Sequence, residues 1–162
     1  MQARVLLDTG RRAEAAEMLR EALAICREAG TQFCGPKVTS ALSRAVDDPA
    51  ERAALLAEGK EMLRRGAVGH NHLWFYRDAI EALLSARDGA GALEYVAALE
   101  DYTRAEPLPW SDLFAARGRL LAGATRGNFD DGRREDLVRV RTALHNAGLM
   151  AFLPPIEAAL VT

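Results

Sequence analysis

Apolar residues recur at helical spacing along most of the chain. Between Arg11 and Ala29 they form two stripes, each with the three- and four-residue steps of an α-helix. The stripes are Ala15-Leu19-Ala22-Leu23-Cys26 and Met18-Ala22-Ile25-Ala29. A helix with two apolar stripes is expected to contact two neighbours, as an inner helix does when it packs on its own partner and on the next helix pair.

Helix-breaking residues divide the sequence into pieces of about helix length. The breakers include Gly30, Asp47-Asp48-Pro49, Asp88-Gly89, Pro107-Leu108-Pro109, Gly127-Asn128 and Gly148. The pieces pair into units at roughly residues 1–30, 35–66, 70–105 and 111–147, and a short amphipathic segment follows at 149–161. We therefore predict one all-α domain over residues 1–162. Its expected architecture is a right-handed α-solenoid of antiparallel helix pairs, with about three and a half repeats and a C-terminal capping helix.

Several of these units resemble tetratricopeptide (TPR) repeats. The first has, in order, a turn glycine, a small residue, a larger apolar residue and an Ala-Leu pair, which are Gly10, Ala15, Leu19 and Ala22-Leu23. A later unit places Ala92 at the small position, although Gly89 stands where the family usually has an aromatic residue. In the last unit Phe129 occupies the aromatic turn position, but Gly132 and Asp136 replace the small and large apolar residues. The resemblance implies a degenerate helical-repeat scaffold.

A second resemblance concerns three stretches in the later part of the chain. They read GHNHLWFYRDAIE at 69–81, YTRAEPLPWSD at 102–112 and RGRLLA at 117–122. They are similar to the C-terminal helical region of bacterial nucleotide cyclases that join a class III adenylate or guanylate cyclase domain, an ATPase module and TPR-like repeats. The resemblance covers about residues 10–160 and implies a regulatory or assembly segment. No Gly-rich phosphate loop ending in Gly-Lys-Ser/Thr occurs here, so it transfers neither cyclase nor ATPase activity.

The charge and composition of the chain limit the kinds of partner that it is expected to bind. The chain has 21 Lys and Arg against 23 Asp and Glu, a formal net charge of -2, which lacks the positive excess that non-specific nucleic-acid binding needs. No apolar stretch approaches the roughly 18 residues needed to cross a bilayer, and no secretory leader is recognised. We expect a cytoplasmic protein that binds neither nucleic acid nor membrane. Cys26 and Cys34 are therefore expected to be reduced, buried thiols, since they also lack Cys-x-x-Cys spacing.

The candidate partner-binding residues are aromatic or charged and are predicted to face the inner surface of the solenoid. Trp74, Arg77, Glu81 and Ser85 would line the concave face, where such repeats hold extended peptides. Aromatic residues and Arg are the types that supply binding hot spots. Trp110, after the stiff Glu106-Pro107-Leu108-Pro109 connector, is a further candidate. The alternative for Trp74 and Phe75 is that they only fill the core between repeats.

The other polar motifs are better explained by structural roles than by catalysis or metal binding. His70-Asn71-His72 lacks a completing ligand set, and we expect His70 or Asn71 to cap a helix that starts near Leu73. Ser111 is expected to be another N-cap, because no nucleophile-elbow pattern surrounds it. The charged run at 133–141 is interpreted as a solvated helix face with internal ion pairs. We predict no catalytic residue, no metal site and no cofactor.

The function expected from the sequence is therefore protein–protein interaction. The chain would bind a protein or peptide partner as the regulatory tail of a cyclase-like signalling protein. An alternative is a small-molecule-sensing regulatory segment of an ATPase-type transcription activator. An enzyme is disfavoured because no set of converging titratable groups is found. The segment before Arg11 is too short to cover both stripes of the first long helix, which predicts a homodimer through the open N-terminal repeat.

Overall fold

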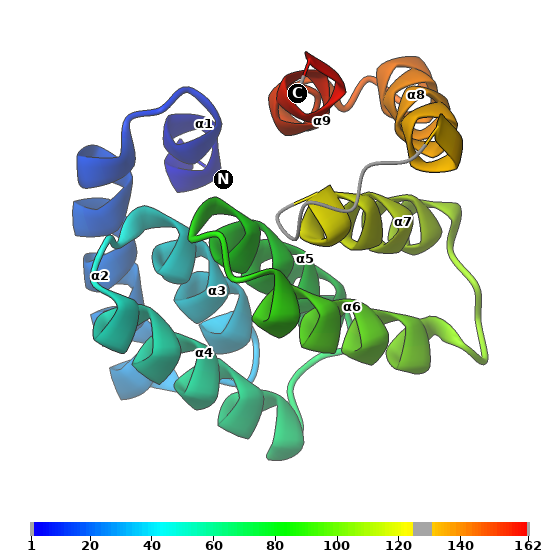
Figure 1. The fold of residues 1–162 in the computed structure, drawn as a ribbon. Helices are drawn as coiled ribbons and strands as arrows, with labels where there is room; N and C mark the ends of the chain where they lie inside the picture. Colours follow the sequence, from blue (N-terminus) through cyan, green and yellow to red (C-terminus); the bar gives the residue numbers. More distant parts are fainter. Residues whose placement is uncertain (1, 125–130, 162) are drawn as a thin grey trace. The chain divides into compact units, whose positions relative to one another are not determined.

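The computed structural model describes residues 2–124 and 131–161, and within these ranges all regular secondary structure is helical (Figure 1). The all-α prediction is confirmed. The turn at Gly127-Asn128 and Phe129, which the sequence assigned to the last unit, lies outside the described residues. None of the described helices combines the length and the apolar character needed to cross a bilayer.

The chain divides into two compact units, Met1–Ala82 and Leu83–Thr162, with the division inside helix α5. Unit 1 contains α1 (Gln2–Asp8), α2 (Arg12–Ala29), α3 (Gly35–Ala45), α4 (Pro49–Arg64) and most of α5 (His70–Ser85). Unit 2 contains α6 (Gly89–Thr103), α7 (Pro109–Ala124), α8 (Asp131–Asn146), the 3₁₀ helix η1 (Met150–Phe152) and α9 (Pro154–Val161).

Short polar side chains and prolines set several helix starts. Asp48 precedes α4, and its carboxylate accepts hydrogen bonds from the backbone N–H of Ala50 at 3.1 Å and of Glu51 at 3.3 Å. Asp88 caps α6 in the same way, accepting from the N–H of Gly91 at 2.9 Å. These caps satisfy backbone donors that have no partner inside the helix. The breakers Asp47-Asp48-Pro49 and Asp88-Gly89 therefore act as predicted.

The expected N-cap role of Ser111 is wrong. Helix α7 begins at Pro109, whose fixed φ angle suits the first helical position, so Ser111 lies inside the first turn. Its side chain is buried rather than facing the helix end.

Each helix from α1 to α3 packs on the next helix along the chain, and α1 also contacts α3. The first apolar stripe of α2 enters the core, where Leu19 and Leu23 pack with Leu42 of α3 and Leu55 of α4. The second stripe is only partly covered, since Met18 and Ala22 pack against this core whereas Ile25 is 58% exposed.

Two ion pairs between α2 and α4 show the direction and register of these helices. Arg20 meets Glu51 at 2.9 Å, and Arg27 meets Glu58 at 2.8 Å. Both pairs join residues 31 positions apart. Two contacts two turns apart share one sequence offset only when the helices run parallel, since antiparallel neighbours would keep the sum of the two residue numbers constant. Helices α2 and α4 therefore lie parallel and in register.

Unit 2 is organised around an aromatic cluster. The ring of Phe114 on α7 packs edge-on against Phe152 of η1, with centroids 4.8 Å apart, and the ring of Trp110 lies 4.6 Å from Phe114. Helix α9 contacts both α7 and α8, and Ile156 is fully buried. The segment predicted at 149–161 is thus helical, with Pro154 at the start of α9.

A fully buried arginine supports this cluster. The guanidinium of Arg117 lies over the ring of Phe152, and its Nε donates a hydrogen bond to the Phe152 carbonyl at 3.1 Å. A cation held against an aromatic face and a carbonyl offsets part of its desolvation cost.

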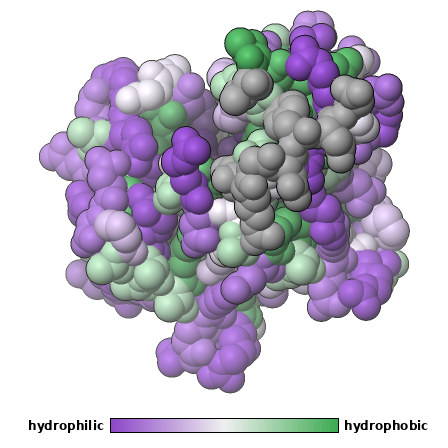
Figure 2. Space-filling model, viewed as in Figure 1, coloured by the Kyte–Doolittle hydropathy of each residue, from purple (hydrophilic) through white to green (hydrophobic). Residues whose placement is uncertain are grey.

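Polar side chains cover most of the face drawn in Figure 2. The run at 133–141 behaves as predicted: Arg134, Glu135 and Arg139 are exposed, and Arg139 pairs with Asp136 one turn earlier. Leu137 and Val140 alone of this run turn into the core.

Gly59 is expected to be essential to the packing of α3, α4 and α5. An added Cβ would overlap the ring of the fully buried Phe75 and lie 2.5 Å from Thr39 Oγ1. Helix propensity alone would make Gly59→Ala stabilising by ~0.5–1 kcal/mol, but overpacking costs about 1–3 kcal/mol, so we predict net destabilisation in urea unfolding. Ala57→Ser, which adds one heavy atom on the exposed face of α4, is the control and should change little. A more stable G59A variant would contradict this packing.

Candidate functional site

The five candidate partner-binding residues lie on two helices and differ in exposure. Trp74, Arg77, Glu81 and Ser85 lie on α5, and Trp110 lies on α7 of unit 2. Arg77 and Glu81 are buried at 6% and 9% exposure, Ser85 is exposed, and both tryptophans are half-buried. The structure therefore does not place these four α5 residues together on an exposed face.

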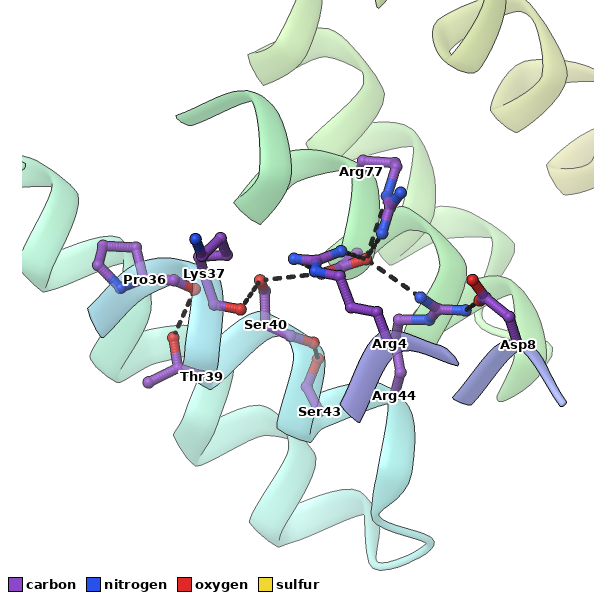
Figure 3. Close-up of polar contacts among 10 residues, drawn as sticks. Arg4, Asp8, Pro36, Lys37, Thr39, Ser40, Ser43, Arg44 and Arg77 are labelled. Carbon is purple, nitrogen blue, oxygen red and sulfur yellow. Dashed lines mark hydrogen bonds and ion pairs between the residues drawn. The ribbon is translucent and has the colours of Figure 1, made fainter. Parts of the chain in front are cut away.

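Arg77 is buried because it belongs to a charge cluster centred on Asp78. The Asp78 side chain is fully buried, and three arginines contact its carboxylate (Figure 3). Arg4 of α1 reaches Oδ2 at 2.7 Å, Arg77 of α5 reaches Oδ1 at 2.6 Å, and Arg44 of α3 reaches Oδ1 at 3.3 Å. Ser40 of α3 adds a long hydrogen bond from its hydroxyl to Oδ2 at 3.5 Å.

Further groups complete this Asp78 cluster. Arg44 also donates to Asp8 at the end of α1, at 3.1 Å. The guanidinium groups of Arg4 and Arg77 both lie over the Trp74 ring, 4.4 Å and 4.6 Å from its centroid. Cation–π attraction is strongest for Trp among the aromatic side chains, so the indole ring stabilises both guanidinium groups. Trp74 therefore has a defined role in the cluster.

The electrostatic balance of the cluster favours an ionised Asp78. Burial by itself would raise the pKa of this carboxyl group, but the positive charges of Arg77, Arg4 and Arg44 outweigh it and lower the pKa. Burial lowers the pKa of Arg4, and the adjacent arginines add to that effect. For Arg44 the carboxylates of Asp78, Glu81 and Asp8 outweigh burial and raise the pKa. The cluster is thus held by one shared anion.

The cluster joins three helices rather than forming an open binding surface. Arg4, Arg44 and Asp78 come from α1, α3 and α5, so one carboxylate links every second helix of unit 1. The feature of the sequence that points to this cluster is Asp78 itself. It shares an apolar stripe of α5 with Phe75, Ala79 and Ala82. A charge in such a stripe requires buried partners, but periodicity does not reveal which arginines supply them.

A second polar device holds two loops of unit 1 together. Asn71 is fully buried, and its Nδ2 donates to the carbonyls of Phe33 at 2.9 Å, Val68 at 3.2 Å and Gln32 at 3.3 Å. The backbone N–H of Val68 also donates to the Gln32 carbonyl at 3.1 Å. The loop between α2 and α3 is thereby fixed to the loop between α4 and α5.

The capping role expected for His70 or Asn71 is wrong. Helix α5 begins at His70, three residues earlier than predicted, and Asn71 donates to carbonyls instead of accepting from helix N–H groups. Its side chain was needed by a loop distant in sequence, which local capping rules do not consider. No group of three or more His, Cys, Asp or Glu side chains suited to a metal occurs among residues 2–124 and 131–161.

The two fixed loops present apolar side chains to solvent. Phe33 is 69% exposed and Val68 is 46% exposed, and the Phe33 ring contacts the edge of His70 with centroids 5.8 Å apart. We call Gln32, Phe33, Val68 and His70 the loop corner. The sequence pattern does not reveal the loop corner, because contacts between two loops more than 30 residues apart bring its residues together. An exposed aromatic residue on a backbone held by several hydrogen bonds is suited to binding a partner.

Unit 2 carries a shallow hollow of about 290 Å³, lined by Arg141, Thr142, His145, Leu153 and Glu157. His145 is exposed there, as the sequence suggested for a histidine on a late helix. The hollow mixes both charge signs on an open surface.

The chain matches no family model, no curated protein and no solved structure.

Removing the charge of Asp78 is expected to destabilise unit 1 strongly. Asp78→Asn leaves three partly or fully buried guanidinium groups without their shared anion, a change that typically costs about 3–5 kcal/mol. Asp47→Asn is the matched control, because Asp47 pairs with Arg12 while 93% exposed, and it should have little effect. Urea unfolding followed by circular dichroism measures both. Equal stability of D78N and the parent would contradict the structural role of the cluster.

The difference in unfolding free energy between the parent and D78N is expected to depend on pH. The pKa of Asp78 is lower in the folded chain than in the unfolded one, so its contribution is complete above the unfolded value of about 3.9. It is lost as the pH falls through the folded pKa. The stability gap between the parent and D78N should therefore be constant near neutral pH and shrink only below about pH 4.

Proposed function

We propose that this chain is a protein-interaction scaffold of stacked helix pairs, and that it serves as the C-terminal helical-repeat segment of a cyclase-like signalling protein. The observation that carries the proposal is the repeated geometry of unit 1. Helices α2 and α4 are parallel and in register through two ion pairs of equal offset, 31 residues. The Asp78 cluster joins α1, α3 and α5.

This arrangement supports the proposal for a physical reason. Alternate helices that share one direction form two layers, one of α1, α3 and α5 and one of α2 and α4. Helix-pair repeats build such layers, and each repeat buries its apolar face only against its neighbours. Scaffolds of this kind expose long surfaces on rigid elements, which is what binding a protein segment requires.

The loop corner is the surface we propose for partner contact in unit 1. It offers Phe33 and Val68, both exposed, on a backbone already fixed by Asn71. A partner that inserts an apolar side chain beside Phe33 would order few additional groups, so little entropy would oppose binding. The earlier hypothesis of a face made by Trp74, Arg77 and Glu81 is replaced, because Arg77 is committed to Asp78.

Site-specific photo-crosslinking tests the interaction proposal. Phe33→p-benzoylphenylalanine keeps an exposed aromatic side chain at the loop corner, and the same change at Tyr102, an aromatic residue 41% exposed in unit 2, is the matched control. We expect a discrete protein adduct from position 33 and none from position 102. The partner is then purified and its affinity measured by calorimetry. Phe33→Ala should weaken it about tenfold or more, whereas Tyr102→Ala should leave it nearly unchanged.

Two outcomes would contradict the proposal. The first is a purified partner whose affinity does not change in F33A while circular dichroism shows an intact fold. The second is the absence of any adduct combined with a thermal midpoint raised by nucleotides or metabolites, which would favour the small-molecule-sensing alternative.

The signalling part of the proposal rests on the resemblance to nucleotide cyclases at 69–81, 102–112 and 117–122. It predicts that the genomic sequence preceding the Met1 codon encodes a class III cyclase domain and an ATPase module in the same reading frame. Sequencing that region checks it directly. A different enzyme domain in that position would refute the cyclase assignment and leave the scaffold proposal standing.

A further inference from the structure

The two cysteines of the chain lie against each other in unit 1. Cys26 is in the last turn of α2, and Cys34 immediately precedes α3. Both are free thiols, and their sulfur atoms are 2.9 Å apart. At this distance they are in direct contact, and either thiol can donate a hydrogen bond to the other. A disulfide bond would require the sulfurs to approach to about 2.05 Å, a movement of less than ~1 Å. The eight-residue separation gave no such indication from the sequence.

Backbone geometry brings the two residues together. Gly30 ends α2 with φ at 112°, a value that L-residues with a side chain rarely adopt, and its N–H donates to the Cys26 carbonyl at 2.9 Å. The chain reverses there, and Pro36 in the first turn of α3 fixes the start of the next helix. Asn71 then holds Gln32 and Phe33, so the residue before Cys34 is fixed from outside the loop.

The two thiols differ in access. Cys26 is buried at 6% exposure, whereas Cys34 is half-buried and reachable from solvent. Burial, and then the hydrogen bond to Cys34, raise the pKa of Cys26 to about 11, so Cys26 keeps its proton near neutral pH. An oxidant from solution therefore meets Cys34 first, with Cys26 already in position behind it.

We propose that Cys26 and Cys34 form a redox-active dithiol that a low-molecular-weight disulfide of the glutathione class converts reversibly into an intramolecular disulfide. The Cys34 thiolate attacks one sulfur of the oxidant, whose S–S bond breaks and releases one glutathione thiolate. Cys26 then loses its proton to that thiolate or to water and attacks the Cys34 sulfur, which releases the second glutathione. Two protein thiols are oxidised, and one glutathione disulfide is reduced to two thiols.

The new bond would close the turn between α2 and α3. It would connect the end of one helix to the beginning of the next across residues 27–33, which include the exposed Phe33. Because Asn71 fixes the same loop from the other side, oxidation would add a covalent restraint where two polar ones already act. The chemistry itself is independent of the proposed interaction function and would operate in the chain without a partner.

Peptide mapping of the full-length chain tests the proposal. Trypsin cleaves after Arg27 and Lys37, so Cys26 and Cys34 fall on different peptides, 21–27 and 28–37. After equilibration with glutathione disulfide and alkylation, we expect these two peptides to be joined in one species that dithiothreitol separates. The oxidised chain should remain monomeric on a non-reducing gel. Its thermal midpoint should rise by about 5–10 °C, as expected for a restraint on a short loop.

Single variants distinguish an ordered reaction from simple surface oxidation. Cys26→Ser should retain one glutathione on Cys34, because the thiol that resolves the mixed disulfide is missing. Cys34→Ser should acquire no glutathione, because Cys26 is buried. Circular dichroism confirms that both variants fold. The proposal is overturned if both cysteines of the parent remain open to alkylation after oxidation, if the linkage joins two chains, or if Cys26 is the thiol modified first.

Discussion

The cost of burying one carboxylate governs the organisation of unit 1. Asp78 has no contact with solvent, and an ionised group in that position is tolerated only with close, well-oriented opposite charges. The chain supplies three arginines from α1, α3 and α5 and places the Trp74 ring against two of them. Because each arginine comes from a different helix, satisfying the charge also fixes how these helices lie beside one another. An apolar contact would be less demanding about register.

Helices α2 and α4 of the same unit are joined by a second set of ion pairs, and these contribute much less to the free energy of folding. The pairs Arg20–Glu51 and Arg27–Glu58 are partly exposed, so each adds little stability. Their equal sequence offset is more informative than their strength, because it records that α2 and α4 are parallel and in register. Buried charge in one layer and surface charge in the other are both consistent with stacked helix pairs, and this geometry is the basis of the proposed scaffold function.

The loop corner concentrates the features that point to activity beyond packing. Asn71 uses one buried amide to fix two loops, and the loops in turn hold Phe33 in solvent. The dithiol of Cys26 and Cys34 lies in the same turn, one residue from Phe33. The proposed partner-binding residue and the proposed redox-active pair share a short turn, so any change in that turn would affect both. Unit 2 has no comparable polar clamp on a loop among the contacts described; its core depends on the aromatic cluster and on Arg117.

The sequence by itself determined the helical fold class and most helix positions. Apolar periodicity and helix breakers each affect only the residues next to them, so local rules are sufficient to locate the helices. Examples of such breakers are Asp48-Pro49, Asp88 and Pro154. It failed where burial or a distant segment decides the role of a side chain. Asn71 holds a distant loop instead of capping a helix, and Ser111 and Arg77 are buried. Only tertiary structure brought Arg4 and Arg44 to Asp78, and Cys26 to Cys34. Hydrogen bonds and ion pairs between segments depend on distances in space, and a one-dimensional pattern of apolar and polar residues does not contain those distances.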